Sequence, residues 1–184
     1  MKNETERFKE ACENGDLETV KLLLQDKRVD PTDDHNYAIR FASQNGHLEV
    51  VKLLLQDKRV DPAVGNNFVI RRASDKGYIE IIKLLLEYNR VDPTDANNGA
   101  IRLASMCGYL GIVRLLLQDK RVDPSVNNNY SIKKASEYGH SEVVKLLLRD
   151  KRVWKKLIKS NRKYLNNNLC NLIKLEKMQR LINN

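Results

Sequence analysis

The chain has 184 residues, 41% of them hydrophobic, and a formal net charge of +9 at pH 7. Its length and apolar content suffice for one domain with a buried core or for one short array of repeats. No segment approaches the roughly 18 to 20 uncharged apolar residues of a membrane-spanning helix, and residues 1–11 are too charged for a secretion signal. We therefore expect an intracellular protein without a transmembrane segment, in the cytoplasm or, alternatively, in the nucleus.

One pattern recurs along the chain every 31 residues. All four prolines follow this interval, each after Val-Asp, and alanines and glycines repeat with them: Pro31, Pro62, Pro93 and Pro124; Ala11, Ala42, Ala73, Ala104 and Ala135; Gly15, Gly46, Gly77, Gly108 and Gly139. A fixed period of this length is typical of stacked supersecondary units. It predicts five repeats, at about 1–30, 31–61, 62–92, 93–123 and 124–153.

The first part of each repeat predicts a short helix. In the second repeat this helix covers residues 37–44, and Asn36 is placed to cap it, with its side-chain oxygen accepting from an early backbone N–H. The same capping role is expected at Asn67, Asn98 and Asn129. Gly46 would end the helix with a positive φ. In the fourth repeat we expect Ile101 to be buried between neighbouring units.

The second part of each repeat predicts another helix, which in the second repeat covers about residues 48–57. It is polar only along one stripe, formed by Glu49, Lys52 and Gln56. A helix that is apolar over most of its circumference must be covered on nearly every side. Stacking of each helical pair on the units before and after it provides that cover.

The segment from Asn45 to Leu55, with sequence NGHLEVVKLLL, resembles the second-helix signature of ankyrin repeats, and it recurs from Asn14, Lys76 and Tyr138. The resemblance covers about residues 5–153. It implies an all-α fold, an ankyrin-like helix-turn-helix solenoid with short turn connections. The family's first-helix signature, Thr-Pro-Leu-His-x-Ala, survives only in part, for example over residues 37–42.

The period of 31 residues is shorter than the usual 33, which predicts a connection between units trimmed by about two residues. With its Val-Asp-Pro turns and Asn-rich connections, the chain resembles the short-period ankyrin subtype of large DNA viruses of amoebae and some protists. A viral origin would place the protein in the host cell.

The resemblance implies a non-catalytic scaffold that binds a protein partner through the concave groove of the first helices and turn tips. Positions there that differ between repeats are the candidates for partner contacts. They are Tyr37, Phe41, Phe68, Arg72, Tyr78, Leu103, Met106, Tyr109, Tyr130, Lys134 and Tyr138. The alternative is that these positions differ between repeats only because packing does not restrain them, and that they have no role in binding. We expect the chain to be a monomer.

A basic residue recurs at one first-helix position, as Arg40, Arg71, Arg102 and Lys133. Two interpretations stay open. The side chains could hold the array together by donating to carbonyls, Asp or Asn of the adjoining turns. Alternatively, the row could bind an extended acidic peptide.

The excess positive charge lies at the C-terminal end. Residues 151–184 hold ten basic residues and one acidic residue, Glu176, a net +9, so residues 1–150 are neutral. We expect residues 154–184 to form a basic helical C-terminal cap or a degenerate sixth repeat. The alternative is polyanion binding, to nucleic acid or an anionic membrane. Its candidate residues are Lys155, Lys156, Lys159, Arg162 and Lys163.

Catalytic and metal-binding motifs are missing from the sequence. His35, His47 and His140 are scattered, and no glycine-rich phosphate loop or metal-ligand spacing occurs. The three cysteines are odd in number and far apart, which favours free thiols. We expect no enzymatic activity, no cofactor and no metal site.

Overall fold

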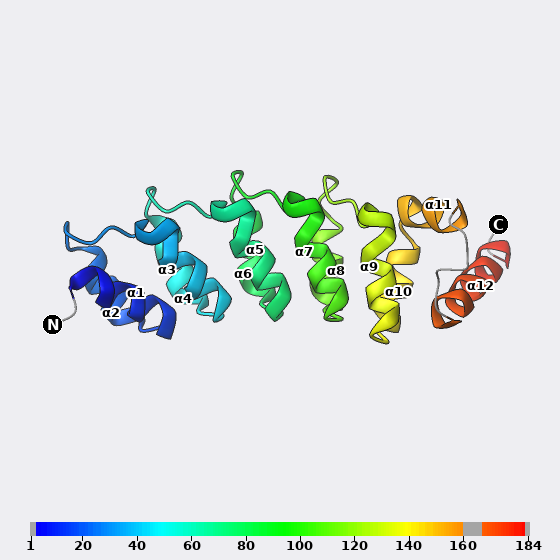
Figure 1. Ribbon diagram of the computed structural model, residues 1–184, viewed down its shortest axis with the longest axis horizontal. Coiled ribbons are helices and arrows are strands. Elements are labelled where there is room, and N and C mark those ends of the chain that lie inside the picture. The colour runs from blue at the N-terminus through cyan, green and yellow to red at the C-terminus, as the bar shows by residue number, and fades with distance from the viewer. Residues whose placement is uncertain (1–2, 160–166, 183–184) are drawn as a thin grey trace. The chain divides into compact units, whose positions relative to one another are not determined.

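The computed structural model describes residues 3–159 and 167–182 (Figure 1). In these ranges the regular elements are twelve helices, and no strand occurs. The helices are α1 (Glu4–Asn14), α2 (Leu17–Leu24), α3 (Asp33–Gln44), α4 (Leu48–Gln56), α5 (Val64–Lys76), α6 (Ile79–Leu86), α7 (Asp95–Met106), α8 (Leu110–Leu116), α9 (Val126–Glu137), α10 (Ser141–Leu148), α11 (Lys151–Lys159) and α12 (Asn167–Ile182). The predicted all-α, ankyrin-like helix-turn-helix fold is confirmed.

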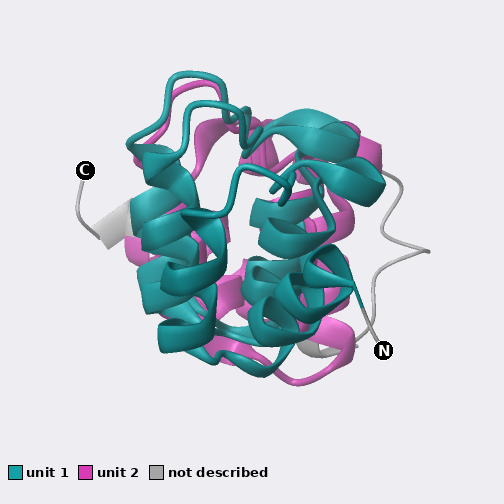
Figure 2. Ribbon diagram, turned by 90° about the vertical axis from the view of Figure 1, so that its left-hand side faces the viewer, with its two compact units in different colours: residues 1–95 teal, residues 96–184 magenta. Residues whose placement is uncertain are grey.

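The chain divides into two compact units, residues 1–95 and residues 96–184 (Figure 2). In the first unit, first helices contact first helices, α1 with α3 and α3 with α5, and second helices contact second helices, α2 with α4 and α4 with α6. In the second unit, α8 contacts α10, and both α11 and α12 contact α9 and α10. Like helices therefore stack on like, as an array of helical pairs requires.

The core follows the apolar positions of the repeat. In α4, Val51 and Leu54 are fully buried at a spacing of three, and Ile82 and Leu85 repeat this in α6. Ile101 is fully buried as expected. The valine before each Asp-Pro pair is also buried, as is its counterpart in the fifth repeat: Val29, Val60, Val91, Val122 and Val153.

Near the start of α3, α5, α7 and α9, three consecutive residues form a left-handed turn, residues 34–36, 65–67, 96–98 and 127–129, with φ between +49° and +62°. This region costs L-residues about 1–2 kcal/mol each, and Gly, Asn and Asp tolerate it best. The turns contain mostly these three residue types. The Asn-rich connections are thus selected by backbone conformation.

The predicted capping role of the asparagines is wrong. The Oδ1 atom of Asn36 accepts from the backbone N–H of Asp61 at 2.9 Å, in the Val-Asp-Pro turn of the next repeat. Asn67 accepts in the same way from Asp92 at 2.8 Å, and Asn98 from Asp123 at 2.7 Å. An N-cap residue has non-helical, typically extended backbone angles, whereas each of these asparagines is left-handed, so its side chain reaches the neighbouring repeat.

The fourth asparagine in this register, Asn129 of the fifth repeat, has no such partner. Its side chain is fully buried, and neither its Oδ1 nor its Nδ2 has a hydrogen-bond partner among the described residues. The residue 25 positions later is Trp154, whose N–H donates to the carbonyl of Asp150 at 3.0 Å within α11. Proline disfavours helix in the residue before it, and Lys155 stands where the earlier repeats have proline. The chain is therefore free to continue as a helix there.

The recurring glycines make room for a ring from the next repeat. Gly46 has φ +83°, and a Cβ atom placed on it would lie 2.7 Å from the ring of Tyr78. Gly15 and Gly108 face the rings of His47 and His140 in the same way. The Nε2 atom of His47 also lies 2.8 Å from the carbonyl oxygen of Glu13. Positive φ is common to all five recurring glycines, and at Gly15, Gly46 and Gly108 the close ring contact is a second reason for glycine.

We predict that the inter-repeat asparagine bond contributes measurably to stability. Asn98→Ala should lower the free energy of unfolding by about 1–3 kcal/mol more than Asn129→Ala, because only Asn98 leaves a backbone N–H unpaired. Both residues are left-handed, with φ of +56° and +61°, so the conformational cost of alanine is shared. Urea unfolding of both variants measures the difference. Equal losses would show that the bond contributes nothing.

We predict that alanine is tolerated differently at two left-handed glycines. Gly46→Ala should cost about 1–3 kcal/mol more than Gly139→Ala, because the new methyl group would displace the Tyr78 ring. At Gly139, with φ +79°, a Cβ atom would meet nothing within 4 Å, so this variant reports the backbone cost alone. Thermal unfolding compares the two. If both variants unfold at the same midpoint temperature, the contact with the Tyr78 ring places no constraint on residue 46.

Candidate binding surface

The eleven candidate contact residues lie mainly on the first helices, and none of them is buried. The first unit holds Tyr37 and Phe41 on α3, Phe68 and Arg72 on α5, and Tyr78 just before α6. The second unit holds Leu103 and Met106 on α7, Tyr109 just before α8, Tyr130 and Lys134 on α9, and Tyr138 just after α9. By contrast, Ala38 and Ile39 are almost fully buried. Each first helix thus has one packed face and one accessible face.

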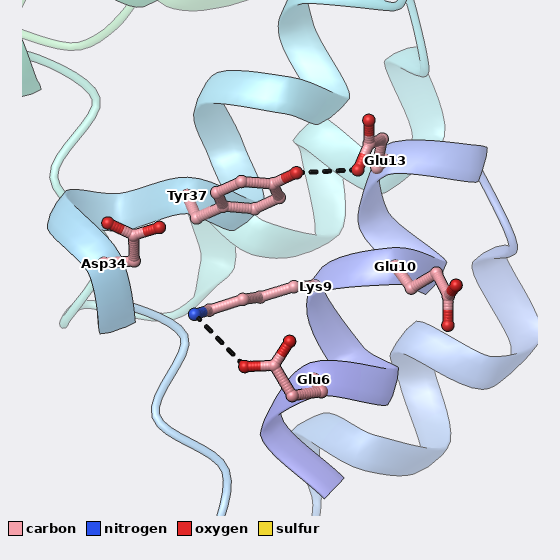
Figure 3. Close-up of a pocket in the computed structure, with 6 residues that line it drawn as sticks. All are labelled: Glu6, Lys9, Glu10, Glu13, Asp34 and Tyr37. Carbon is pink, nitrogen blue, oxygen red and sulfur yellow. Dashed lines mark hydrogen bonds and ion pairs between the residues drawn. The ribbon is translucent and has the colours of Figure 1, made fainter. Parts of the chain in front are cut away.

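At the N-terminal end of the first unit, Tyr37 borders a cavity of about 400 Å³ between α1 and α3 (Figure 3). Its lining is mostly acidic: Glu6, Glu10 and Glu13 from α1 and Asp34 from the left-handed turn, with Lys9 as the one cation. The Tyr37 hydroxyl donates to the Glu13 carboxylate at 2.7 Å. The cavity is therefore an acidic recess with an aromatic wall.

Lys9 already occupies part of this recess. Its Nζ atom lies 2.7 Å from the Asp33 carboxylate and 3.8 Å from Glu6. The hydrogen bond with Asp33 raises the pKa of Lys9. Burial and the hydrogen bond to Glu13 raise the pKa of Tyr37 to about 12, so its hydroxyl stays protonated at neutral pH. A ligand in this recess would meet a neutral phenol, one ammonium and several carboxylates.

A cation from one repeat lies over an aromatic ring of the next. Lys9 Nζ is 5.7 Å from the centroid of Tyr37, the Arg40 guanidinium is 5.1 Å from Phe68, and that of Arg102 is 4.8 Å from Tyr130, always 28 residues apart. These distances are in the range of favourable cation–π contacts.

In the first unit, ring stacking and cation–π contacts link four of the five candidate residues, with Arg40 as the link between Phe41 and Phe68. The rings of Tyr37 and Phe41 stack with centroids 4.0 Å apart. Arg40 lies 5.7 Å from the Phe41 ring as well as over Phe68, and Arg72 lies 5.2 Å from Phe68. The fifth candidate, Tyr78, is instead half-buried with its ring against Gly46, in a packing role between repeats.

In the second unit, Tyr130 lies between Arg102 and Lys134, whose Nζ atom is 5.9 Å from the ring. Lys134 also lies 5.8 Å from the Tyr138 ring and pairs with Glu137 at 2.7 Å. The side chain of Tyr138 is 56% exposed, that of Tyr109 is 36% exposed, and Leu103 and Met106 are half-buried. The α9 face thus presents two tyrosines with a cation between them.

The recurring basic row is tied to the left-handed turns. Arg71 donates from Nε to the carbonyl of Asn66 at 3.0 Å and from Nη2 to that of Gly65 at 3.2 Å. Arg40 and Arg102 donate to the equivalent carbonyls of their own turns. Among the described residues, Lys133 makes no contact of this kind. For the three arginines, the structure favours the interpretation that they hold the turns.

The acidic side chains of α1 were missed by the sequence analysis, although the repeat register could have found them. Glu6 and Glu10 stand 31 residues before the candidates Tyr37 and Phe41, and Glu13 stands 31 residues before Gln44 at the end of α3. Extending the 31-residue step back by one repeat places all three on the accessible face of α1.

The residues of the alternative polyanion site are only partly described. Lys155, Lys156 and Lys159 on α11 are all exposed, and Lys156 also donates from Nζ to the carbonyl of Ser125 at 3.0 Å. Arg162 and Lys163 lie outside the described residues. One of the three described candidates therefore serves to attach α11 to the fifth repeat.

Among the described residues, no helix combines the length and the apolar content that a membrane crossing requires, and no cluster of His, Cys, Asp or Glu could hold a metal ion. A comparison with curated proteins found no match. A family model described as ankyrin repeats (3 copies) matches residues 8–97 and 70–156. These matches cover most of the chain and include both compact units. The chain therefore belongs to the ankyrin-repeat family.

Proposed function

We propose that the chain is a non-catalytic scaffold that binds a protein partner through its first-helix surface, defined as the accessible faces of α1, α3, α5, α7 and α9. Ankyrin repeats are generally protein-protein interaction modules. The observation that carries the proposal is the alternation of rings and cations on these faces, as in the contacts of Phe68 with Arg40 and Arg72. Aromatic residues and arginine dominate the energetics of protein interfaces.

The fixed contacts of these side chains support the proposal. Tyr37 stacks on Phe41, and Tyr130 is held between Arg102 and Lys134, so these rings need little further ordering when a partner binds. The acidic recess beside Tyr37 adds a place for a basic side chain of the partner. The surface therefore suits a partner that combines apolar contacts with charges of both signs.

We also propose five repeats over residues 1–153 and a C-terminal cap over residues 154–184. Val153 and Leu157 of α11 and Leu169 and Ile173 of α12 are buried, and both helices contact α9 and α10. Lys156 attaches α11 to the carbonyl of Ser125. These contacts support a capping role for the basic tail over polyanion binding.

The 31-residue period and the Asn-rich turns support assignment to the short-period subtype of large DNA viruses of amoebae and some protists. Under that proposal the protein is a monomer that acts inside the host cell. The left-handed backbone of the turns explains why asparagine is frequent there, because asparagine tolerates this conformation better than most residues.

The test compares two triple-alanine variants with the parent chain in affinity capture from a nuclease-treated eukaryotic cell lysate, with captured proteins identified by mass spectrometry. The first variant changes exposed candidates, Arg72, Tyr109 and Tyr138. The control changes exposed lysines of second helices, Lys21, Lys52 and Lys83. We expect the first variant to lose captured partner by about tenfold or more, because truncation of interface aromatic and arginine residues commonly costs over 1 kcal/mol each, and we expect the control to match the parent.

Helical circular dichroism should be unchanged in both variants, which separates loss of binding from loss of fold. Equal capture by the two variants and the parent would contradict the assignment of the first-helix surface. Capture that depends on the control lysines would instead place the partner on the second helices.

A further inference from the structure

A second surface lies at the C-terminal end of the second unit. Between α10 and α12 runs a groove of about 550 Å³, which we call the C-terminal groove. Its apolar lining is Leu148 of α10 and Leu172, Leu175 and Met178 of α12. It belongs to a second helix and the cap, and none of the first-helix candidates lines it.

Helix α12 is apolar on more than one side. Leu169 and Ile173 are 1% and 7% exposed and form its packed face. Leu172, Leu175 and Met178 follow each other at steps of three and so lie along one edge of the helix. Leu175 is 58% exposed and Met178 is 61% exposed. A terminal unit normally presents a polar outer face, so this apolar edge is not explained by capping.

The charges around the C-terminal groove indicate what could cover it. Two cations line the groove, Lys145 of α10 and Arg149 directly after that helix, and the exposed Lys174 of α12 is next to Leu175 in the chain. Of the two acidic residues in the lining, Glu142 is paired with Lys145 at 2.6 Å, and Glu176 is the one acidic residue in the C-terminal 34. Charges of opposite sign favour association and like charges oppose it. The lining itself is balanced in charge, but residues 151–184 carry a net +9, so this end of the chain favours an acidic occupant over a second copy of itself.

We propose that the C-terminal groove binds an amphipathic helix of a protein partner, with apolar residues facing the groove and carboxylates along its flanks. The groove between two packed helices can hold a third helix, with apolar anchors at i, i+3, i+4 and i+7. Leu148 and Leu172 form the floor, and Leu175 and Met178 form the exposed edge. Methionine adapts to irregular partners at such surfaces. This interaction does not depend on the first-helix surface.

The test uses a fluorescein-labelled 18-residue helical peptide with leucine at i, i+3, i+4 and i+7 and glutamate at most other positions. The full chain is titrated into it, and fluorescence anisotropy is recorded at low and high salt. We expect saturable binding that weakens as salt rises. A peptide with lysine in place of glutamate should bind at least tenfold more weakly.

Variants of the full chain assign the site. Leu175→Ser with Met178→Ser should weaken binding at least tenfold, and Arg149→Gln with Lys174→Gln should weaken it mainly at low salt. Leu22→Ser is the matched control, because Leu22 is 66% exposed on α2 and lies outside the groove; it should bind like the parent. Circular dichroism should show the same helicity throughout, since Leu22, Leu175 and Met178 are more than half exposed.

Three results would overturn the proposal. The first is no binding of the acidic peptide to the parent chain. The second is equal binding by the Leu175 and Met178 double variant, which would place the peptide elsewhere. The third is a doubling of molar mass in light scattering that is lost in that variant, which would show that a second copy of the chain covers the groove.

Discussion

The hydrogen bond from a turn asparagine to the backbone of the next repeat is the interaction on which the rest of the array depends. Asn36, Asn67 and Asn98 can make it only because the backbone at each is left-handed. Three consecutive left-handed residues cost several kcal/mol in ordinary residue types, which is why the turns are built from Asn, Asp and Gly. The arginine four residues after each of these asparagines donates to carbonyls of the same turn. The arginine therefore stabilises the left-handed turn, and the turn places the asparagine for its hydrogen bond to the next repeat.

This arrangement also shapes the binding surface. An arginine held at its own turn has its guanidinium directed over the next repeat's first helix, where Arg40 meets Phe68 and Arg102 meets Tyr130. The three arginines of the basic row are therefore not available as independent cations for an acidic peptide. A partner would instead meet rings whose faces already carry a positive charge, and it would contact their edges together with the cations. Structural and binding roles coincide in the same side chains.

Much of the fold could be predicted because it depends on periodicity. The 31-residue interval gave the helical pairs, the glycines that end the first helices and the burial of Ile101, each of which follows from side-chain size or spacing. The role of Asn36 was predicted wrongly, because an asparagine before a helix fits either an N-cap or a left-handed turn, and only φ distinguishes them. The acidic recess was missed because Glu6 differs chemically from Tyr37, although both occupy the same register position. The contact residues stay a prediction, since no periodic constraint acts on an accessible face.

The end of the array follows from a change of two residues. Where earlier repeats have Asp-Pro, the fifth is followed by Trp154-Lys155, and without proline the chain continues into α11. The N–H that would have met Asn129 is then used inside that helix, which leaves a buried amide without a partner. Helix α12 contacts α9 and α10 and buries Leu169 and Ile173, but its next edge is left beside α10 with Leu175 and Met178 exposed. Ending the array by helices in place of another turn therefore creates the C-terminal groove, and it does so where the net positive charge of the chain is concentrated.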